Sequence, residues 1–235
     1  MIDIAQLYDN CVYSSIAHAL FVLKEPFFSA SQSWDRMNYS FNDFSGTRGT
    51  ISFDLSGNIL AGAIRDDKSE RCNRYPEFKS IELFANAPGN VKCLAETEAL
   101  QYLFDEKDGV TQPMATVAFW SVGGEIVIDE DIADFKANGG EYLFAIGASH
   151  DELRDYWRGE YDLGDEELGT VDLIYERFKA REAIRSEDVP IIKSKDVQAP
   201  KKRGLFGHKK KAVEQEPDGY AECISSLGEL GIVIE

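Results

Sequence analysis

Histidine and cysteine are scarce in this chain, which has three histidines and four cysteines among 235 residues. His18, His150 and His208 form no i, i+4 pair, and no cysteine lies near any of them in the sequence, so the pattern does not indicate a zinc site. The cysteines are irregularly spaced and form no C-x-x-C motif, which argues against a disulfide framework and favours reduced thiols. We therefore expect no metal or other cofactor.

Motifs for phosphate binding and nucleophilic catalysis are missing as well. Neither G-x-G-x-x-G nor G-x-x-x-x-G-K-[ST] occurs, and there is no G-x-S-x-G. Ser149 and His150 stand beside Asp151, but adjacent residues do not form a catalytic triad, and Ser149 is better explained as a helix cap. We expect that the chain is not an enzyme. One alternative stays open: carboxylates around residues 129–131 would hold a divalent metal, although the D-x-D-x-D-G pattern of a calcium loop is absent.

The sequence also has no secretion leader and no long apolar run. Residues 1–23 have no basic region ahead of their apolar residues and contain Asp3, Asp9 and His18. No apolar run approaches the roughly 18 residues that a membrane span needs. Together with the cysteine pattern, this predicts a cytoplasmic protein that does not bind membranes.

Charge is what the chain has in excess, with 42 acidic against 25 basic residues and a net charge of −17. Residues 193–211 hold eight basic residues and one acidic residue, a net +7, so the rest of the chain is at −24. Residues 125–188 alone hold 19 acids and 7 bases. Such a surface repels nucleic acids and anionic membranes and attracts basic proteins. The alternative is that acidity only keeps the protein soluble.

Composition and periodicity predict three segments. Residues 1–192 are expected to form a single α+β domain, and residues 193–217 a basic flexible linker or loop. Residues 218–235 regain apolar character, and residues 232–234 are expected to dock back on the sheet as a final strand.

Hydrophobic periodicity predicts an α+β fold with a mostly antiparallel sheet, an N-terminal β-meander and three longer flanking helices. The longer helices are expected at residues 4–24, 91–104 and 166–184, and shorter ones at 131–137 and 149–159. Strands are expected at residues 37–41, 49–54, 59–64, 114–122, 125–128 and 142–146. The small residues Ala61, Gly62 and Ala63 indicate that another element packs closely on the third of these strands.

Two groups of residues are candidates for binding a partner. The first lies between residues 33 and 49, where Trp34, Asp35 and Tyr39, with further aromatic and charged residues, combine rings and charges as binding loops do. The alternative is that these rings close the edge of the core. The second group is a predicted acidic belt, which forms one negative face if its two segments are neighbours, and is otherwise only a solvated surface. Its members are Asp129, Glu130, Asp131, Asp134, Asp162, Asp165, Glu166 and Glu167.

Residues 33–53 and 115–121 resemble bacterial immunity proteins, which are encoded beside the genes of polymorphic and contact-dependent toxins. The resemblance spans about residues 1–190 and is one of size, acidity, meander and lack of catalytic motifs; the basic segment departs from it. It implies a cytosolic inhibitor that occludes a cognate, basic toxin domain, with acidic side chains in the place of substrate phosphates. It transfers no individual site residue. A regulatory or ligand-binding module is the main alternative, and the metal-dependent enzyme is the second.

Overall fold

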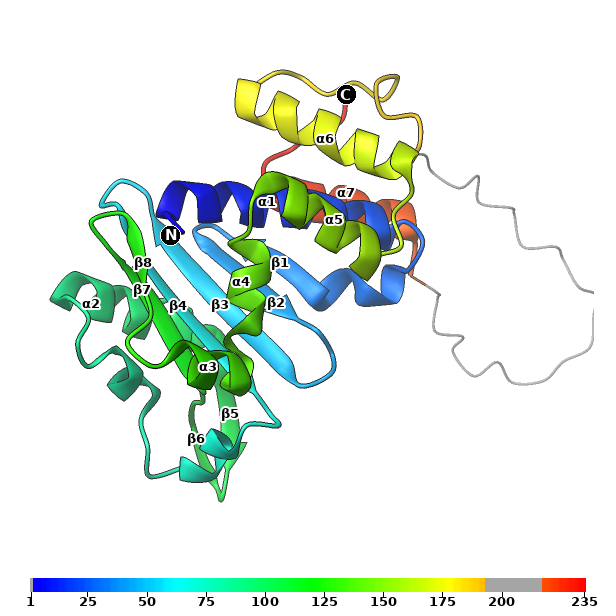
Figure 1. Ribbon diagram of the computed structural model, residues 1–235. Coiled ribbons are helices and arrows are strands. Elements are labelled where there is room, and N and C mark those ends of the chain that lie inside the picture. The colour runs from blue at the N-terminus through cyan, green and yellow to red at the C-terminus, as the bar shows by residue number, and fades with distance from the viewer. Residues whose placement is uncertain (1, 193–216) are drawn as a thin grey trace, which may run out of the picture.

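The computed structural model describes residues 2–192 and 217–235, so most of the predicted basic linker lies outside the described residues. Its centre is a six-stranded antiparallel sheet with the strand order β1-β2-β3-β4-β7-β8 (Figure 1). The strands are β1 (Gln32–Asp35), β2 (Asn38–Asn42), β3 (Thr47–Asp54), β4 (Ile59–Asp66), β7 (Val117–Val122) and β8 (Glu125–Val127). A separate hairpin consists of β5 (Phe104–Lys107) and β6 (Val110–Pro113). The predicted α+β class, antiparallel sheet and N-terminal meander are confirmed, although the prediction did not include β1.

Helices cover both faces of the sheet. They are α1 (Ile4–Val22), α2 (Gly89–Thr97), α3 (Ile132–Phe135), α4 (Glu141–Ile146), α5 (His150–Glu160), α6 (Asp165–Ala180) and α7 (Gly219–Glu229). In the described residues, short 3-10 helices occupy Pro26–Ser31, Glu70–Arg74, Ser80–Phe84 and Ala99–Leu103. The predicted caps are present, because the carboxylate of Asp3 accepts from the Gln6 amide at 2.8 Å and Ser149 forms a capping box with Glu152. The long helix predicted at residues 91–104 is instead divided between α2 and a 3-10 helix.

The larger core lies where α1 packs between the sheet and the helices α5, α6 and α7. Two serines inside α1 bind buried indoles: Ser15 Oγ accepts from Trp34 Nε1 and Ser14 Oγ accepts from Trp157 Nε1, both at 2.8 Å. Each serine hydroxyl in turn donates to the backbone carbonyl four residues earlier in the helix. The polar atoms of this core are therefore satisfied, which makes its packing specific.

The smaller core lies on the opposite face of the sheet, under α2 and the neighbouring 3-10 helices. Ala61 and Ala63 face it, which lets the helices approach β4 closely. On the larger-core side a Cβ at Gly62 would lie 2.2 Å from the ring of Phe119 on β7. The close packing predicted for this strand is confirmed.

The two edge strands of the sheet are both covered. The amide of Ile126 in β8 donates to the carbonyl of Ile2 at 3.0 Å, so the N-terminal segment takes this edge. At the other edge, the amide of Trp34 donates to the carboxylate of Glu229 in α7 at 2.7 Å. Both contacts occupy backbone groups that would otherwise recruit further strands.

The strand predicted at residues 142–146 is wrong, because this segment is helix α4. The apolar run has no clear period, and its burial at Leu143 and Ile146 follows helical spacing. Asn10 of α1 binds the end of the helix, donating to the carbonyls of Ile146 at 2.7 Å and Ala148 at 2.9 Å. With β8 already covered by the N-terminal segment, the sheet has no free edge for this run.

The predicted final strand at residues 232–234 is also wrong. The C-terminal segment returns as α7, which packs against α1 and β1, with Cys223 and Leu227 buried. Ile234 forms only an isolated bridge to Ile184, outside the sheet. None of the helices in the described residues is long and apolar enough to cross a membrane.

Candidate functional site

One hollow is lined mainly by aromatic side chains, and we call it the aromatic pocket. It lies between the end of α1, the 3-10 helix Pro26–Ser31, the β2–β3 turn, α4 and the end of α5, with a volume of about 260 Å³. These elements meet at the right-hand side of the sheet in Figure 1. The lining residues are Phe21, Phe28, Ser31, Gln32, Phe41, Asn42, Asp43, Phe44, Tyr142, Trp157, Glu160 and Tyr161.

Stacked rings form the walls of the pocket. The ring of Tyr161 lies between those of Phe21 and Trp157, with centroid distances of 4.4 and 4.6 Å and interplanar angles of 11° and 18°. On the sheet side, Phe41 stacks on Tyr142 at 18°. Since the rings hold one another from three separate helices and one strand, the walls are rigid without help from a ligand.

A chain of hydrogen bonds runs beneath the pocket. Tyr39 donates its hydroxyl proton to Gln32 Oε1 at 2.9 Å, and Gln32 Nε2 donates to the Tyr161 hydroxyl at 2.7 Å. Because Tyr39 has only one proton, the 2.6 Å contact between the hydroxyls of Tyr39 and Tyr142 requires Tyr142 to donate. Burial raises the pKa of Tyr39, Tyr142 and Tyr161, so all three stay protonated at neutral pH and the donor roles of Tyr39 and Tyr142 persist.

A buried histidine holds the 3-10 helix that forms one wall. Nε2 of His18 lies 3.0 Å from the Phe28 carbonyl oxygen and 2.8 Å from Ser31 Oγ. A carbonyl only accepts, so Nε2 carries the proton. Burial lowers the pKa of His18 to about 4, although the hydrogen bond to Phe28 opposes the shift, so the ring is neutral at pH 7.

The rim of the pocket exposes two phenylalanines. Phe28 is 41% exposed and Phe44 53%, and their rings meet edge to face at 5.9 Å. Phe27, which is 72% exposed, adjoins Phe28 in the 3-10 helix but does not line the pocket. Such a group of exposed rings is unusual for a surface that contacts only water.

Two carboxylates stand at the mouth of the pocket. Asp43 Oδ1 accepts from the amides of Ser45 at 2.7 Å and Thr47 at 2.8 Å, which fixes the β2–β3 turn. Glu160 is the last residue of α5, where the negative end of the helix dipole disfavours a carboxylate. Within residues 2–192 and 217–235, neither carboxylate forms an ion pair with a lysine or arginine.

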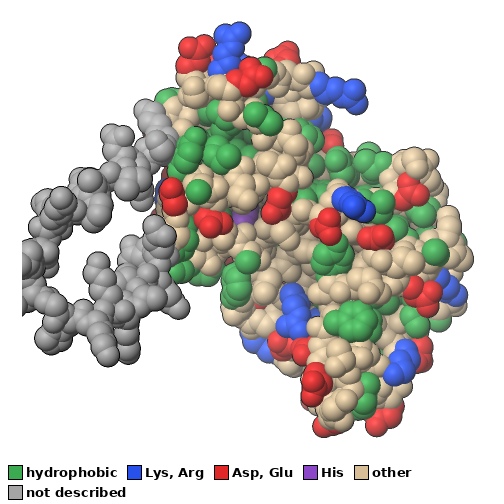
Figure 2. Space-filling model, turned by 180° about the vertical axis from the view of Figure 1, so that it is seen from behind, with side chains coloured by type: hydrophobic (Ala, Val, Ile, Leu, Met, Phe, Trp, Pro, Cys, Tyr) green, Lys and Arg blue, Asp and Glu red, His purple; other side chains and the backbone are tan. Residues whose placement is uncertain are grey.

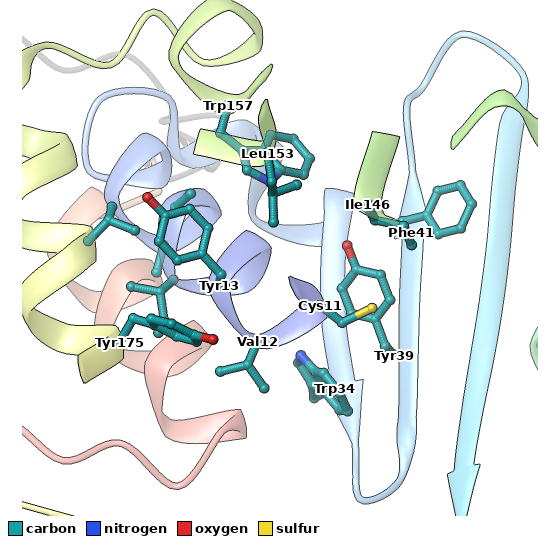
Figure 3. Packing of buried hydrophobic residues seen from close by; sticks show 14 of the residues in the cluster. Cys11, Val12, Tyr13, Trp34, Tyr39, Phe41, Ile146, Leu153, Trp157 and Tyr175 are labelled. Atoms are coloured by element: carbon teal, nitrogen blue, oxygen red, sulfur yellow. The ribbon is translucent and has the colours of Figure 1, made fainter. Parts of the chain in front are cut away.

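Trp34 and Tyr39, predicted to bind a partner, are core residues. Trp34 is 8% exposed and Tyr39 fully buried, and both point into the larger core beside Cys11 (Figure 3). The prediction of a binding role for these two rings is therefore wrong, and the alternative, that they close the core, describes them. Asp35 is exposed and accepts from the Tyr102 hydroxyl at 2.7 Å. Phe41, Asp43 and Phe44 from the same stretch do line the pocket.

The first segment of the predicted acidic belt is occupied by local contacts. Asp129 accepts from Asn86 at 2.6 Å, and Glu130 forms a two-pronged pair with Arg71 at 2.5 and 3.1 Å. Asp131 caps α3, accepting from two backbone amides. Asp134 is exposed. In the described part of the chain, no group of three or more His, Cys, Asp or Glu side chains is arranged to hold a metal ion.

The second segment lies around the start of α6. Asp165 pairs with Arg158 at 2.8 Å, and Glu167 pairs with Lys24 while it accepts from the Gly164 amide at 2.5 Å. Asp162 and Glu166 are exposed.

The two acidic segments do not form one face. In Figure 1 the short helix α3 lies low, in front of the sheet, whereas α6 lies at the top, above α5. On the face seen in Figure 2, acidic side chains are scattered among other residues rather than gathered. The two segments therefore do not form the single negative face of the predicted belt: Asp131 caps α3, and Asp165, Glu166 and Glu167 lie in the first turn of α6, where the helix dipole favours acids.

Sequence patterns missed the pocket residues that come from the helices. Tyr142, Trp157 and Tyr161 lie in segments that share no motif with β2, and only the fold brings them together. One signal was available: the Phe27–Phe28 doublet follows Pro26 in a segment with no periodic pattern that would explain its burial.

No protein-family model, no curated protein and no solved structure matches this chain.

Proposed function

We propose that this chain is a cytosolic bacterial binding protein that holds a basic protein partner at the aromatic pocket, and inhibits it by occlusion as an immunity protein inhibits its toxin. The observation that carries the proposal is the combination of two exposed phenylalanines with two carboxylates that no base in the described residues neutralises. We name the surface formed by Phe28, Phe44, Asp43 and Glu160 the binding rim.

Exposed aromatic side chains support a protein partner. Protein interfaces concentrate their binding energy in a few large rings that become desolvated, surrounded by residues that exclude water. The rings of Phe28 and Phe44 touch each other across the pocket mouth and are mounted on a 3-10 helix and a hydrogen-bonded turn. They therefore lose little conformational freedom when a partner binds.

The net charge supports a basic partner. The chain outside residues 193–211 is at −24, which accelerates the encounter with a cationic surface and makes it sensitive to salt. Asp43 and Glu160 place negative charge beside the exposed rings, so a cationic partner surface can contact the carboxylates and the rings together. An acidic face of this kind competes with the phosphates of a nucleic-acid substrate for a basic active site.

Affinity capture from a lysate of the source organism tests the proposal when it is combined with matched variants. The full-length chain is immobilised, and retained proteins are eluted with rising salt. One basic protein is expected in a stoichiometric amount from the wild type, with much less from the variant Phe44→Ser, Asp43→Asn. The control variant Asp134→Asn, Glu166→Gln removes two exposed charges elsewhere and is expected to retain the partner.

A functional assay then separates inhibition from simple binding. The captured protein, expressed alone, should arrest growth or degrade its substrate, and co-expression of the wild-type chain should relieve this effect. Relief that persists with the rim variant, or a captured protein with no toxic activity, refutes inhibition through the binding rim. Equal retention by the rim and control variants refutes the site itself.

A further inference from the structure

We infer that the aromatic pocket is a receptor for one arginine side chain, presented by the basic protein partner. This inference rests on the proposed function, and it specifies the chemistry by which the binding rim recognises its partner. The argument depends on the volume of the pocket, the faces of its rings and the charge at its mouth.

The volume fits a side chain better than a free metabolite. Pockets for small molecules usually enclose roughly 300–1,000 Å³. The aromatic pocket, at about 260 Å³, falls just below that range and is open at the rim. One long side chain that arrives from a protein surface can fill such a space while the surrounding partner residues cover Phe28 and Phe44.

The rings favour a planar cation. Seven of the lining side chains are aromatic, and the pair formed by Phe28 and Phe44 stands at the entrance. Aromatic faces attract cations, and a guanidinium group also stacks on them because it is flat and weakly hydrated. A lysine ammonium is a compact and strongly hydrated point charge, so it gains less from leaving water at this site.

The two carboxylates at the mouth act on the same region. Asp43 and Glu160 both line the pocket, although they come from different elements, the β2–β3 turn and the end of α5. A guanidinium that enters the pocket can therefore form charge-assisted hydrogen bonds with them.

Polar groups inside the pocket can complete the recognition. Gln32 Oε1 accepts from Tyr39 and Gln32 Nε2 donates to Tyr161, so both polar atoms of this side-chain amide already form hydrogen bonds. Asn42 lines the pocket beside Asp43, and its Oδ1 accepts only from the Phe44 amide at 2.9 Å among the described contacts. A second lone pair on this oxygen remains available for a guanidinium N–H.

The test uses Nα-acetyl-L-arginine amide as a probe and the three tryptophan indoles as reporters in ¹⁵N-resolved NMR spectra of the full chain. Trp157 lines the pocket, Trp34 lies in the larger core away from the lining, and Trp120 lies in the smaller core on the other face of the sheet. Arginine amide is expected to shift the Trp157 indole signal saturably and to leave the signal of Trp120 unchanged. The corresponding lysine amide should bind roughly ten-fold more weakly, and the citrulline amide, a neutral analogue of the same shape, should not bind measurably.

Charge variants complete the test. Asp43→Asn, Glu160→Gln should weaken arginine amide at least roughly ten-fold, while the control Asp134→Asn, Glu166→Gln should leave its affinity unchanged. Citrulline amide binding as tightly as arginine amide, or an unaffected charge variant, overturns the inference. If the probe fails while partner capture still depends on Phe44, the proposed function stands and the arginine inference falls. If the probe binds with the expected charge dependence but no toxic partner is inhibited, the pocket chemistry stands and the inhibitor proposal falls.

Discussion

Protonation of His18 should make the fold less stable in weak acid. The ring is 1% exposed, and its pKa is about 4 in the folded chain against the ordinary value of 6.5 for a free histidine. Between these two values the unfolded chain binds a proton at His18 and the folded chain does not. Stability from this residue is therefore complete above about pH 6.5 and is lost as the pH falls toward 4.

The size of the effect follows from the two pKa values. One pKa unit corresponds to about 1.4 kcal/mol, so the full difference is about 3 kcal/mol and is reached only below about pH 4. Between about pH 7.5 and pH 5.5, the linkage relation gives a loss of about 1.3 kcal/mol. The latter pH stays above the sequence pI of about 4.6.

Urea unfolding at both pH values, for the wild type and for His18→Gln, measures this loss. Glutamine keeps an N–H that can donate to the Phe28 carbonyl but does not titrate, so the variant should lack this part of the pH dependence. Subtracting the pH response of the variant from that of the wild type cancels the contributions of the carboxylates and the other histidines to the pH dependence of stability. Equal pH responses in the two proteins would mean that His18 titrates normally, and the buried neutral ring would be refuted. A ring-proton titration by NMR with a midpoint near 4 would support it directly.

Three further substitutions test the packing around the site. Glu229→Ala removes the acceptor at the edge of β1, and should cost about 1 kcal/mol in urea unfolding because the group is partly solvated. Gly62→Ala places a Cβ within 2.2–2.6 Å of Phe119 ring atoms and should cost about 1–3 kcal/mol. Tyr39→Phe deprives Gln32 Oε1 of its donor and should cost about 1–3 kcal/mol, visible as a lower melting temperature.

Each of these substitutions has a matched control. Glu229→Gln keeps an acceptor and also removes a negative charge from the C-terminal end of α7, so it should be close to neutral. Gly89→Ala meets no atom within 4 Å and should not destabilise the protein. Tyr220→Phe removes a hydroxyl that makes no hydrogen bond in the contacts of residues 2–192 and 217–235, and should change stability little. Losses in the controls as large as in the test variants would contradict the contacts assigned above.

The parts of the fold that sequence could predict are those with local signals. Asp3 and Pro26 delimit α1, and the turn at residues 56–58 joins β3 to β4 as the alternation of apolar residues indicates. The error at α4 arose because a five-residue apolar run is too short to show whether its period is that of a helix or a strand. Its helical structure depends on the hydrogen bonds from Asn10 and on the β8 edge of the sheet, which residues 2–4 already cover. Neither condition is visible in the run itself.

The candidate site was harder to predict than the fold, for a related reason. Aromatic and charged residues between 33 and 49 indicate a surface, but β-alternation sends Tyr39 and Phe41 to the core face, and the exposed aromatic ring of this stretch is Phe44 in the turn. Other walls come from α4 and the end of α5, about a hundred residues later in the chain. The acidic runs, although conspicuous, are largely explained by the cap of α3 at Asp131 and by the ion pairs of Glu130 with Arg71 and of Asp165 with Arg158.

Helix α5 shows why the binding rim is the part of the surface that calls for a functional explanation. At its first turn Glu152 completes the capping box with Ser149, where the helix dipole favours an acid. At its last residue Glu160 is an acid where the dipole favours a base, and the described residues offer it no ion pair. The next helix, α6, instead ends with Arg177 and Lys179 in its last turn. Residues that are unfavourable for the local structure tend to be retained where function requires them. Glu160 is such a residue, and it lies with exposed rings and a second carboxylate, Asp43, at the mouth of one pocket. A cationic group of the partner would form favourable contacts with both carboxylates and with the exposed rings.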